Sequence, residues 1–297
     1  MTAAVEVEHL TRRFGTLVAV DDVSFRLDAG EVLGFLGPNG AGKSTTLRTL
    51  MGFLRPTSGS CRVLGTWPGD DVAVRARIGY LPGDFRIEPR MRPAELFAWF
   101  ARLRGVRLDR AHALAERFEL DPTRRFGTLS KGNRQKVGLV QAFLHAPDVV
   151  LLDEPSTGLD PLVQRELLGL VREAAADGAA VLFSSHVLPE VERAADRVAV
   201  LRRGRLVTVA PVHELLDRAR HRLELSFADP VPAEALRGVP GVVDVTADGA
   251  RLDIVVDGPV GPVLAAAAGR STLLRVAPAG DELEDLFFSD SLREVAR

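Results

Sequence analysis

Short apolar stretches separated by turns run through the first two thirds of the chain. Within residues 5–36, the runs VEVEHL, VDDVSFRL and EVLGFLG have the length and content of strands. VVLLDE at 149–154 and AAVLFSSH at 179–186 are continuous enough to be buried strands, and helical patterns such as PLVQRELLGLVREAAADG lie between them. Because strands alternate with helices up to about residue 210, this part is predicted to be α/β with a mostly parallel sheet.

A helical segment is predicted at about 84–145 within this domain. PAELFAWFARLRG at 93–105 begins with proline, ends with glycine and has a broad apolar stripe that we expect in the core. The segment holds 13 Lys and Arg against 7 Asp and Glu, in a chain with a net charge of −2. Two interpretations stay open: a solvated face, or a surface that meets a partner or an anionic membrane. The stripe comprises Leu96, Phe97, Trp99, Phe100 and Leu103.

The pattern changes after Pro211. HRLELSF and RLDIVVDG alternate with period two, and ADGA between GVVDV and RLDIVV predicts a hairpin turn. DELEDLFF is expected to form a helix capped by Asp281. We therefore predict two parts, an α/β domain at 1–212 and a small α+β appendage at 213–297, and we assign no catalytic residue to the second.

Composition removes several classes of protein. A net charge of −2 over 297 residues gives no overall basic field that would attract nucleic acid. The lone cysteine, Cys61, has no internal partner for a disulfide, which fits a reducing compartment. The start of the chain does not have a signal-peptide pattern, and no run reaches about 18 apolar residues, so we expect no membrane span.

GPNGAGKST at 37–45 has the spacing of a phosphate-binding loop, and it lies between a predicted strand and a predicted helix. Its glycines allow successive N–H groups to point inward, and the helix start adds the positive end of a dipole. Lys43 is predicted to reach the β- and γ-phosphates of ATP, and the Ser44 hydroxyl to bind Mg²⁺. The predicted phosphate contacts are Gly37, Pro38, Asn39, Gly40, Ala41, Gly42, Lys43, Ser44 and Thr45.

Two acids end the buried strand at 149–154, at the edge where open α/β sheets bind ligands. Asp153 is predicted to join the Mg²⁺ site. Glu154 is placed to act on the water that attacks the γ-phosphate. His186 ends the next buried strand, and we predict that it contacts the γ-phosphate.

LSKGN at 129–133 supplies a second anion-binding feature. Ser130 is a hydroxyl donor, Gly132 offers an unobstructed N–H, and a helix begins there. One nucleotide needs one phosphate loop. A second anion-binding segment has a use if it closes over ATP that is bound to another copy of the chain. This predicts a dimer.

Taken in order, these motifs resemble the ATP-binding subunits of ABC transporters over residues 5 to about 210. GPNGAGKST is similar to the Walker A motif, VVLLDE to Walker B with a catalytic glutamate, and LSKGN to the LSGGQ signature. STGLD ends in the D-loop residue Asp160, and SSH gives the switch histidine. The resemblance implies that Phe14 stacks on adenine and that Val20 packs against the base.

One departure from the family concerns its metal-contacting glutamine. The chain reads IGYLPGDF, with Gly83 at that position and Asp84 next. Glycine has no side chain that could bind metal. Three alternatives are open: Asp84 replaces the glutamine at the metal, a backbone carbonyl replaces it, or the nucleotide site is coupled to the membrane partner by a different route. An aspartate at such a turn is more commonly a solvated acid.

The resemblance implies an ATPase that uses ATP and Mg²⁺, forms a homodimer and drives a separately encoded permease from the cytoplasmic face of the membrane. The extra C-terminal residues resemble the appendage of subunits that pair with exporters of drugs, antibiotics or lipids. A soluble ABC ATPase acting on ribosomes or DNA, and a nucleotide-dependent sensor with little turnover, are the alternatives. The transported substrate is not readable from this chain.

Overall fold

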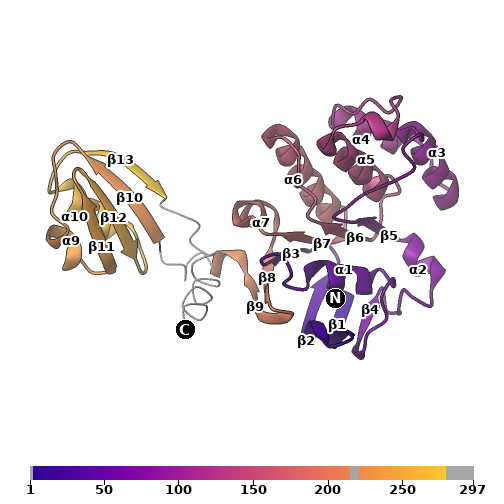
Figure 1. Cartoon of the computed structure of the whole chain (residues 1–297), viewed down its shortest axis with the longest axis horizontal. Helices are drawn as coiled ribbons and strands as arrows, with labels where there is room; N and C mark the ends of the chain where they lie inside the picture. Colours follow the sequence, from indigo (N-terminus) through magenta and orange to yellow (C-terminus); the bar gives the residue numbers. More distant parts are fainter. Residues whose placement is uncertain (1–2, 215–220, 279–297) are drawn as a thin grey trace. The chain divides into compact units, whose positions relative to one another are not determined.

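The computed structural model describes residues 3–214 and 221–278. The chain divides into two compact units, Met1–Ala210 and Pro211–Arg297, close to the boundary expected between residues 212 and 213. Figure 1 shows the helices and strands of both units. Each unit has its own hydrophobic core.

A six-stranded sheet forms the centre of the first unit. Neighbouring strands pair in parallel over its first five positions, and three of these strands are buried along their whole length. The predicted mostly parallel α/β sheet is confirmed. Its order is β5 (Ile78–Leu81), β6 (Val149–Asp153), β7 (Ala180–Ser185), β3 (Val32–Leu36), β8 (Arg197–Arg202) and β9 (Arg205–Pro211).

A second, antiparallel sheet shares a core with the first. Its order is β2 (Leu17–Asp28), β1 (Ala3–Phe14) and β4 (Ser58–Val63). The rings of Phe25 on β2 and Phe35 on β3 meet edge to face, with centroids 5.0 Å apart. Cys61 lies in this core, and burial raises the pKa of its thiol to about 12, so it behaves as a small apolar side chain.

The helices of the first unit lie on both sides of the central sheet, and three of them form a cluster to one side in Figure 1. That cluster consists of α3 (Pro93–Arg104), α4 (Asp109–Arg117) and α5 (Lys131–Phe143), with the short 3₁₀ helix η1 (Phe126–Thr128). The others are α1 (Lys43–Leu50), α2 (Val72–Ala76), α6 (Pro161–Ala176) and α7 (Leu188–Ala194). In the described part of the chain, no helix has both the length and the apolar content for a membrane span.

Helix α3 has the predicted ends, but its apolar stripe is only partly in the core. Pro93 begins it, and Gly105 ends it in the left-handed conformation. Leu96 and Phe97 are buried, whereas Trp99 and Leu103 are 55% and 60% exposed. The prediction that the whole stripe is core was wrong. Leu96 and Leu103 are seven residues apart and so lie close together around the helix, and the neighbouring elements cover the stripe at Leu96 and Phe97 but leave Trp99 and Leu103 uncovered.

The half-buried ring of His145 is expected to make folding sensitive to acid. Burial, and next the positive charge of Arg104, lower the pKa of this ring from 6.5 to about 4. The unfolded chain then binds a proton near pH 6.5 and the folded chain only near pH 4, so stability falls as the pH falls through this window. The loss has an upper bound of about 3 kcal/mol at about 1.4 kcal/mol per pKa unit, and solvent screening of the partly exposed ring reduces it.

Urea unfolding at several pH values between 7.5 and 4 measures this loss. The His145→Gln variant has no titrating ring at this position, so its stability should fall less over the same range. Equal losses in the two proteins would assign the acid sensitivity to other groups.

The second unit is a four-stranded antiparallel sheet with two helices on one face. Leucine, isoleucine and valine alternate along its strands and pack with Leu236, Val263 and Ala267 of the helices. The expected hairpin at residues 247–250 joins β11 and β12. The predicted α+β character is confirmed, while the helix expected at 281–288 lies outside the described residues. The chain runs through β10 (His221–Phe227), α9 (Glu234–Arg237), β11 (Val242–Asp248), β12 (Arg251–Val256), α10 (Gly261–Ala268) and β13 (Leu273–Pro278), with sheet order β11-β12-β10-β13.

Candidate functional site

The loop at 37–42 connects buried β3 to α1 and wraps around the start of that helix. Gly42 has a φ of +105°, and a Cβ there would lie 2.7 Å from the carbonyl oxygen of Ala19. Only glycine fits this position without strain. Lys43, the first residue of α1, is 5% exposed and donates from Nζ to the carbonyl oxygens of Gly37 and Pro38. The side chain therefore curls back over its own loop, where phosphates of a nucleotide would lie.

A cavity of about 310 Å³ opens beside this loop. Phe14 on β1 is 43% exposed at its edge, with the Arg12 guanidinium carbon 4.6 Å from the ring centroid. Leu17, Val18 and Ala19 also line the cavity, but Val20 does not. The lining comprises Phe14, Leu17, Val18, Ala19, Glu154 and residues 38–45.

The position of Val20 corrects the prediction that it packs against a base. Val20 is fully buried in the shared core, below Gly42. Val20 lies farther from the hairpin turn along β2 than Leu17, Val18 and Ala19, which are the β2 residues that line the cavity. The cavity would therefore offer a base the side chains of residues 17–19 rather than that of Val20.

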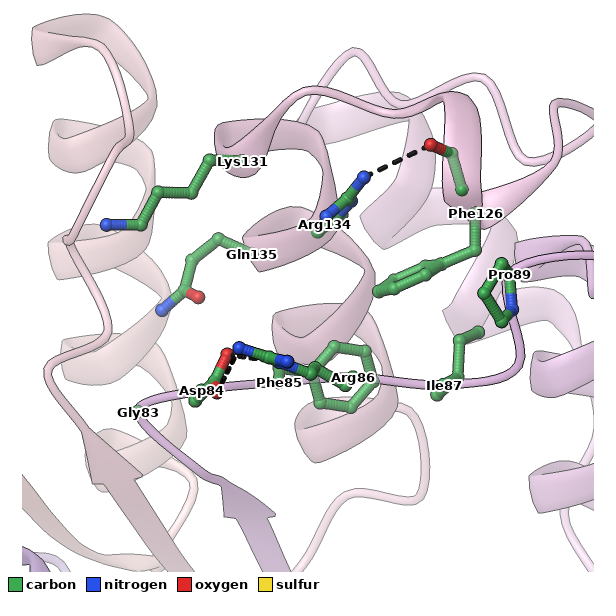
Figure 2. A pocket seen from close by; sticks show the side chains of 11 residues that line it. Gly83, Asp84, Phe85, Arg86, Ile87, Pro89, Phe126, Lys131, Arg134 and Gln135 are labelled. Atoms are coloured by element: carbon green, nitrogen blue, oxygen red, sulfur yellow. Dashed lines mark hydrogen bonds and ion pairs between the residues drawn. The ribbon is translucent and has the colours of Figure 1, made fainter.

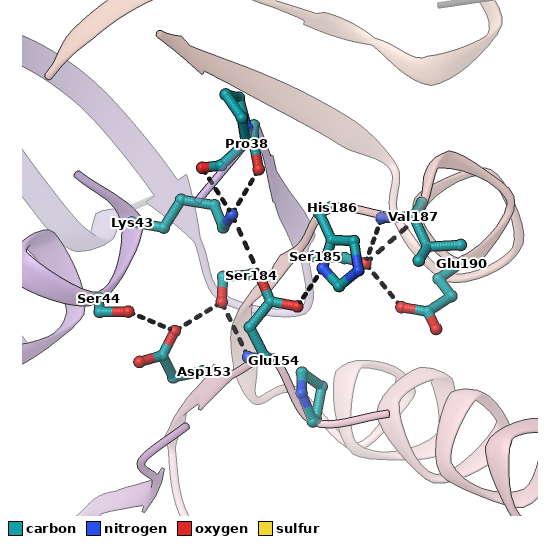
Figure 3. A network of polar contacts seen from close by, with 12 residues as sticks. Pro38, Lys43, Ser44, Asp153, Glu154, Ser184, Ser185, His186, Val187 and Glu190 are labelled. Carbon is teal, nitrogen blue, oxygen red and sulfur yellow. Dashed lines mark hydrogen bonds and ion pairs between the residues drawn. The ribbon is translucent and has the colours of Figure 1, made fainter. Parts of the chain in front are cut away.

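Asp153 ends β6 in an almost fully buried position, 1% exposed. Its Oδ1 accepts hydrogen bonds from the hydroxyl of Ser44, at 3.0 Å, and from that of Ser184, at 2.8 Å (Figure 3). Among the described residues, no basic side chain forms an ion pair with this carboxylate. A buried carboxylate and a hydroxyl at hydrogen-bonding distance are hard oxygen donors, and they fit a Mg²⁺ ion.

Glu154 lies at the centre of the polar network in Figure 3. Its carboxylate is 3.1 Å from Lys43 Nζ through Oε1, and 2.7 Å from His186 Nδ1 through Oε2. Its backbone N–H donates to Ser184 Oγ at 2.9 Å. Its φ is +50°, a left-handed conformation that costs a non-glycine residue about 1 to 2 kcal/mol. Surrounding contacts hold this carboxylate in a strained position facing the phosphate loop.

His186 follows β7 directly and is 53% exposed. The turn that carries it is fixed from below, because Ser185 donates to Glu190 Oε2 at 2.7 Å and accepts from the Val187 N–H at 2.9 Å. The structure therefore brings Phe14, the phosphate loop and Glu154 together around one cavity. Asp153 and His186 adjoin it through their contacts with Ser44 and Glu154.

The signature residues lie elsewhere. Ser130 is exposed, caps α5 and accepts from the Asn133 N–H. A Cβ on Gly132 would lie 2.5 Å from the carbonyl oxygen of Gly158, so the two segments touch. Asp160 caps α6, and hydrogen bonds from the Val163 and Leu162 N–H groups lower its pKa. None of Ser130, Gly132 and Asp160 lines the cavity of the phosphate loop.

Gly83 and Asp84 have different surroundings. A Cβ on Gly83 would lie 3.2 Å from Asp153 Oδ2, so position 83 adjoins the predicted metal site. Asp84 is turned to Arg86, at 2.8 Å, and this hydrogen bond lowers the pKa of the exposed carboxyl. The aspartate thus has the commoner fate of a solvated turn acid.

A second cavity, of about 580 Å³, lies between the 83–89 segment and α5 (Figure 2). Its lining combines apolar side chains with three basic ones and the Asp84 carboxylate. The apolar residues are Phe85, Ile87, Pro89 and Phe126, and the basic residues are Arg86, Lys131 and Arg134.

Two site residues escaped sequence analysis. They are Ser184, which the SSH motif contains without a predicted role, and Gln135. Gln135 is 6% exposed, and its Nε2 donates to the carbonyl oxygens of Glu154, at 3.2 Å, and Pro155, at 3.0 Å. The signal available was an uncharged polar residue shortly before the apolar part of the helix, where burial requires hydrogen-bond partners.

Comparisons with known proteins agree with this geometry. A family model described as ABC transporter matches residues 20–157. Over 99% of this chain and 98% of the other, the sequence is 31% identical to Nod factor export ATP-binding protein I of Burkholderia pseudomallei. The chain belongs to the family of ABC transporter ATP-binding proteins. This ABC subunit is also 31% identical to bacitracin transport ATP-binding protein BcrA of Bacillus licheniformis, over 77% of this chain and 76% of the relative.

Solved structures confirm the ABC fold. One described as the ATP binding subunit of an ABC transporter superposes with a TM-score of 0.67 and 31% identity, over 72% of this chain and 92% of that chain. The predicted P-loop NTPase fold and the ATPase activity are therefore confirmed, and ATP is the nucleotide of this ABC subunit.

Proposed function

We propose that two copies of this ABC subunit close on two molecules of ATP, each held by residues of both copies. The separation of Ser130 from the phosphate loop supports this most directly. Ser130 opens a helix whose N-terminus suits an anion, yet it lies outside the cavity of its own chain. A second copy supplies the phosphate, and a symmetric exchange satisfies both signature segments. Asp160, two residues beyond the Gly158 that touches Gly132, belongs to the same interface.

Within each half-site, different residues of the cavity contact the base, the phosphates and the metal ion. Phe14 stacks on adenine, and Val18, which pairs with Arg13 across the hairpin, takes the contact that was expected of Val20. Residues 37–45 hold the phosphates through inward N–H groups and Lys43. Ser44 and Asp153 would hold Mg²⁺, which supplies positive charge against the phosphate oxygens when it is bound.

Glu154 is the proposed base that accepts a proton from the attacking water. Its carboxylate contacts Lys43 and His186. Phosphates give Lys43 and His186 anionic oxygens to contact, which frees Glu154 for water. Hydrolysis depends mainly on positioning and charge stabilisation, so an incompletely closed site should be slow.

The partner we propose is a separately encoded membrane permease, which this subunit would bind at the cytoplasmic face of the membrane. In view of the relatives, the proposed permease is an exporter. The 580 Å³ cavity beside Gly83 is suited to receive a segment of it. The apolar lining takes the buried face of a short helix, and the basic rim favours an acidic residue on that segment. Because position 83 adjoins Asp153, a segment in this cavity would respond to the state of the nucleotide site.

Co-expression with the membrane protein encoded next to this chain tests the proposal. A neighbour with about six apolar segments of about 20 residues is expected to co-purify in detergent, and its cargo to stimulate ATP hydrolysis. Ile87→Asp, which puts a charge in the cavity, should lose the permease, whereas Val207→Asp, at an exposed site on β9, should retain it. Co-purification with ribosomes or DNA instead would favour the soluble alternatives.

A further inference from the structure

The first turns of α5 hold the segment that carries the catalytic glutamate, within the same chain. Gln135 donates both hydrogens of its amide to this segment, to the carbonyl oxygens of Glu154 and Pro155. Gly132 packs against Gly158, and the aliphatic stem of Lys131 also lies beside Gly158. Figure 2 shows Lys131 and Gln135 projecting to the same side of α5. Residues 154–158 are therefore held against the start of α5 by these contacts.

Glu154 is the residue in this segment whose position most depends on outside contacts. Its left-handed backbone is unfavourable for a side chain larger than glycine, so its neighbours must hold it there. Ser184 accepts from its N–H, and Gln135 donates to its carbonyl oxygen. These two hydrogen bonds fix the peptide groups on either side of the Glu154 Cα and so set the direction of its carboxylate.

We infer that Gln135 is a positioning residue. It couples the contact of α5 with the ATP of the second copy to the position of the catalytic base in the site of its own copy. The inference rests on the proposed two-copy function. The start of α5 contacts ATP bound by the second copy, while Gln135 on the same helix sets Glu154 for the ATP of its own copy. When the signature segment of one copy docks on the ATP of the second copy, it thereby positions Glu154 in the site of its own copy.

Gln135→Met preserves the length of the side chain but removes its donors. We expect kcat to fall roughly 10- to 100-fold, because a small displacement of a reacting group has effects of this size. Equilibrium binding of a fluorescent ATP analogue to the monomer should stay within about twofold, because Gln135 lies outside the phosphate-loop cavity. Gln135→Glu, with an acceptor facing two carbonyl oxygens, should lose at least as much kcat and serves if the methionine variant does not fold.

The matched control is Gln141→Met on the same helix. Gln141 is similarly buried, but six residues, or about 9 Å, along α5 and on another side of it. Its kcat should stay within about twofold of the wild type. Wild-type kcat in folded Gln135→Met, or an equal loss in Gln141→Met, would overturn the inference.

A double variant tests the coupling itself. If Ser130 acts on Glu154 through Gln135, the loss in Ser130→Ala with Gln135→Met should be smaller than the product of the single losses. Multiplicative losses would contradict the coupling. The proposed function is judged separately by Glu154→Gln, so a normal Gln135→Met beside an inactive Glu154→Gln rejects only this inference.

Discussion

The Glu154→Gln variant is expected to bind ATP and to hydrolyse it roughly 100- to 10,000-fold more slowly, the range that a positioned general base supplies. An amide does not take a proton from water. The substitution also removes the negative charge 3.1 Å from Lys43 Nζ, so ATP should bind at least as tightly as before. With hydrolysis blocked, the closed pair of copies should accumulate.

Steady-state ATPase assays and size-exclusion chromatography with MgATP measure the two effects. The expected result is low turnover together with elution at twice the monomer mass. Glu234→Gln, the same chemical change at an exposed position on helix α9, is the control and should behave as the wild type. Unchanged turnover in Glu154→Gln would remove the assignment of the base.

Ser130→Arg should abolish hydrolysis and leave ATP binding by the monomer intact. The exposed Ser130 hydroxyl caps α5, and an arginine there fills the space in which the phosphate of the second copy would lie. Loss of the cap alone costs about 1 kcal/mol, too little to unfold the domain. The large effect therefore comes from blocked closure.

A fluorescent ATP analogue reports binding by the monomer, and size exclusion reports the closed pair when Ser130→Arg is combined with Glu154→Gln. Thr123→Arg, at an exposed turn of the same helical cluster, controls for an added positive charge. Loss of ATP binding in Ser130→Arg would mean that this segment only supports its own domain. Cross-linked, ATP-loaded dimers with Ser130 remote from the triphosphate would refute the two-copy site.

Much of the fold could be predicted because it depends on local patterns. The near-continuous apolar runs of β3, β6 and β7 are favourable only inside a parallel sheet covered on both faces. Pro93 and Gly105 mark the ends of α3 through their own backbone preferences. Trp99 and Leu103 were misplaced because a helical period gives the width of an apolar face, but the neighbours determine how much of it is covered.

The sequence by itself determined which groups are available for the proposed chemistry. The glycines of the phosphate loop, Lys43, Asp153 and Glu154 belong to contiguous motifs, whose spacing alone sets their place at strand and helix ends. Only the tertiary structure decided which partners these groups meet. It turned Asp84 to Arg86, gave the cavity edge to Val18 rather than Val20, and brought Gln135 to the carbonyl oxygens beside Glu154. Some of these contacts join residues that are distant in sequence, and others depend on the direction of one side chain. Both kinds of contact are fixed only when the helices and strands pack together.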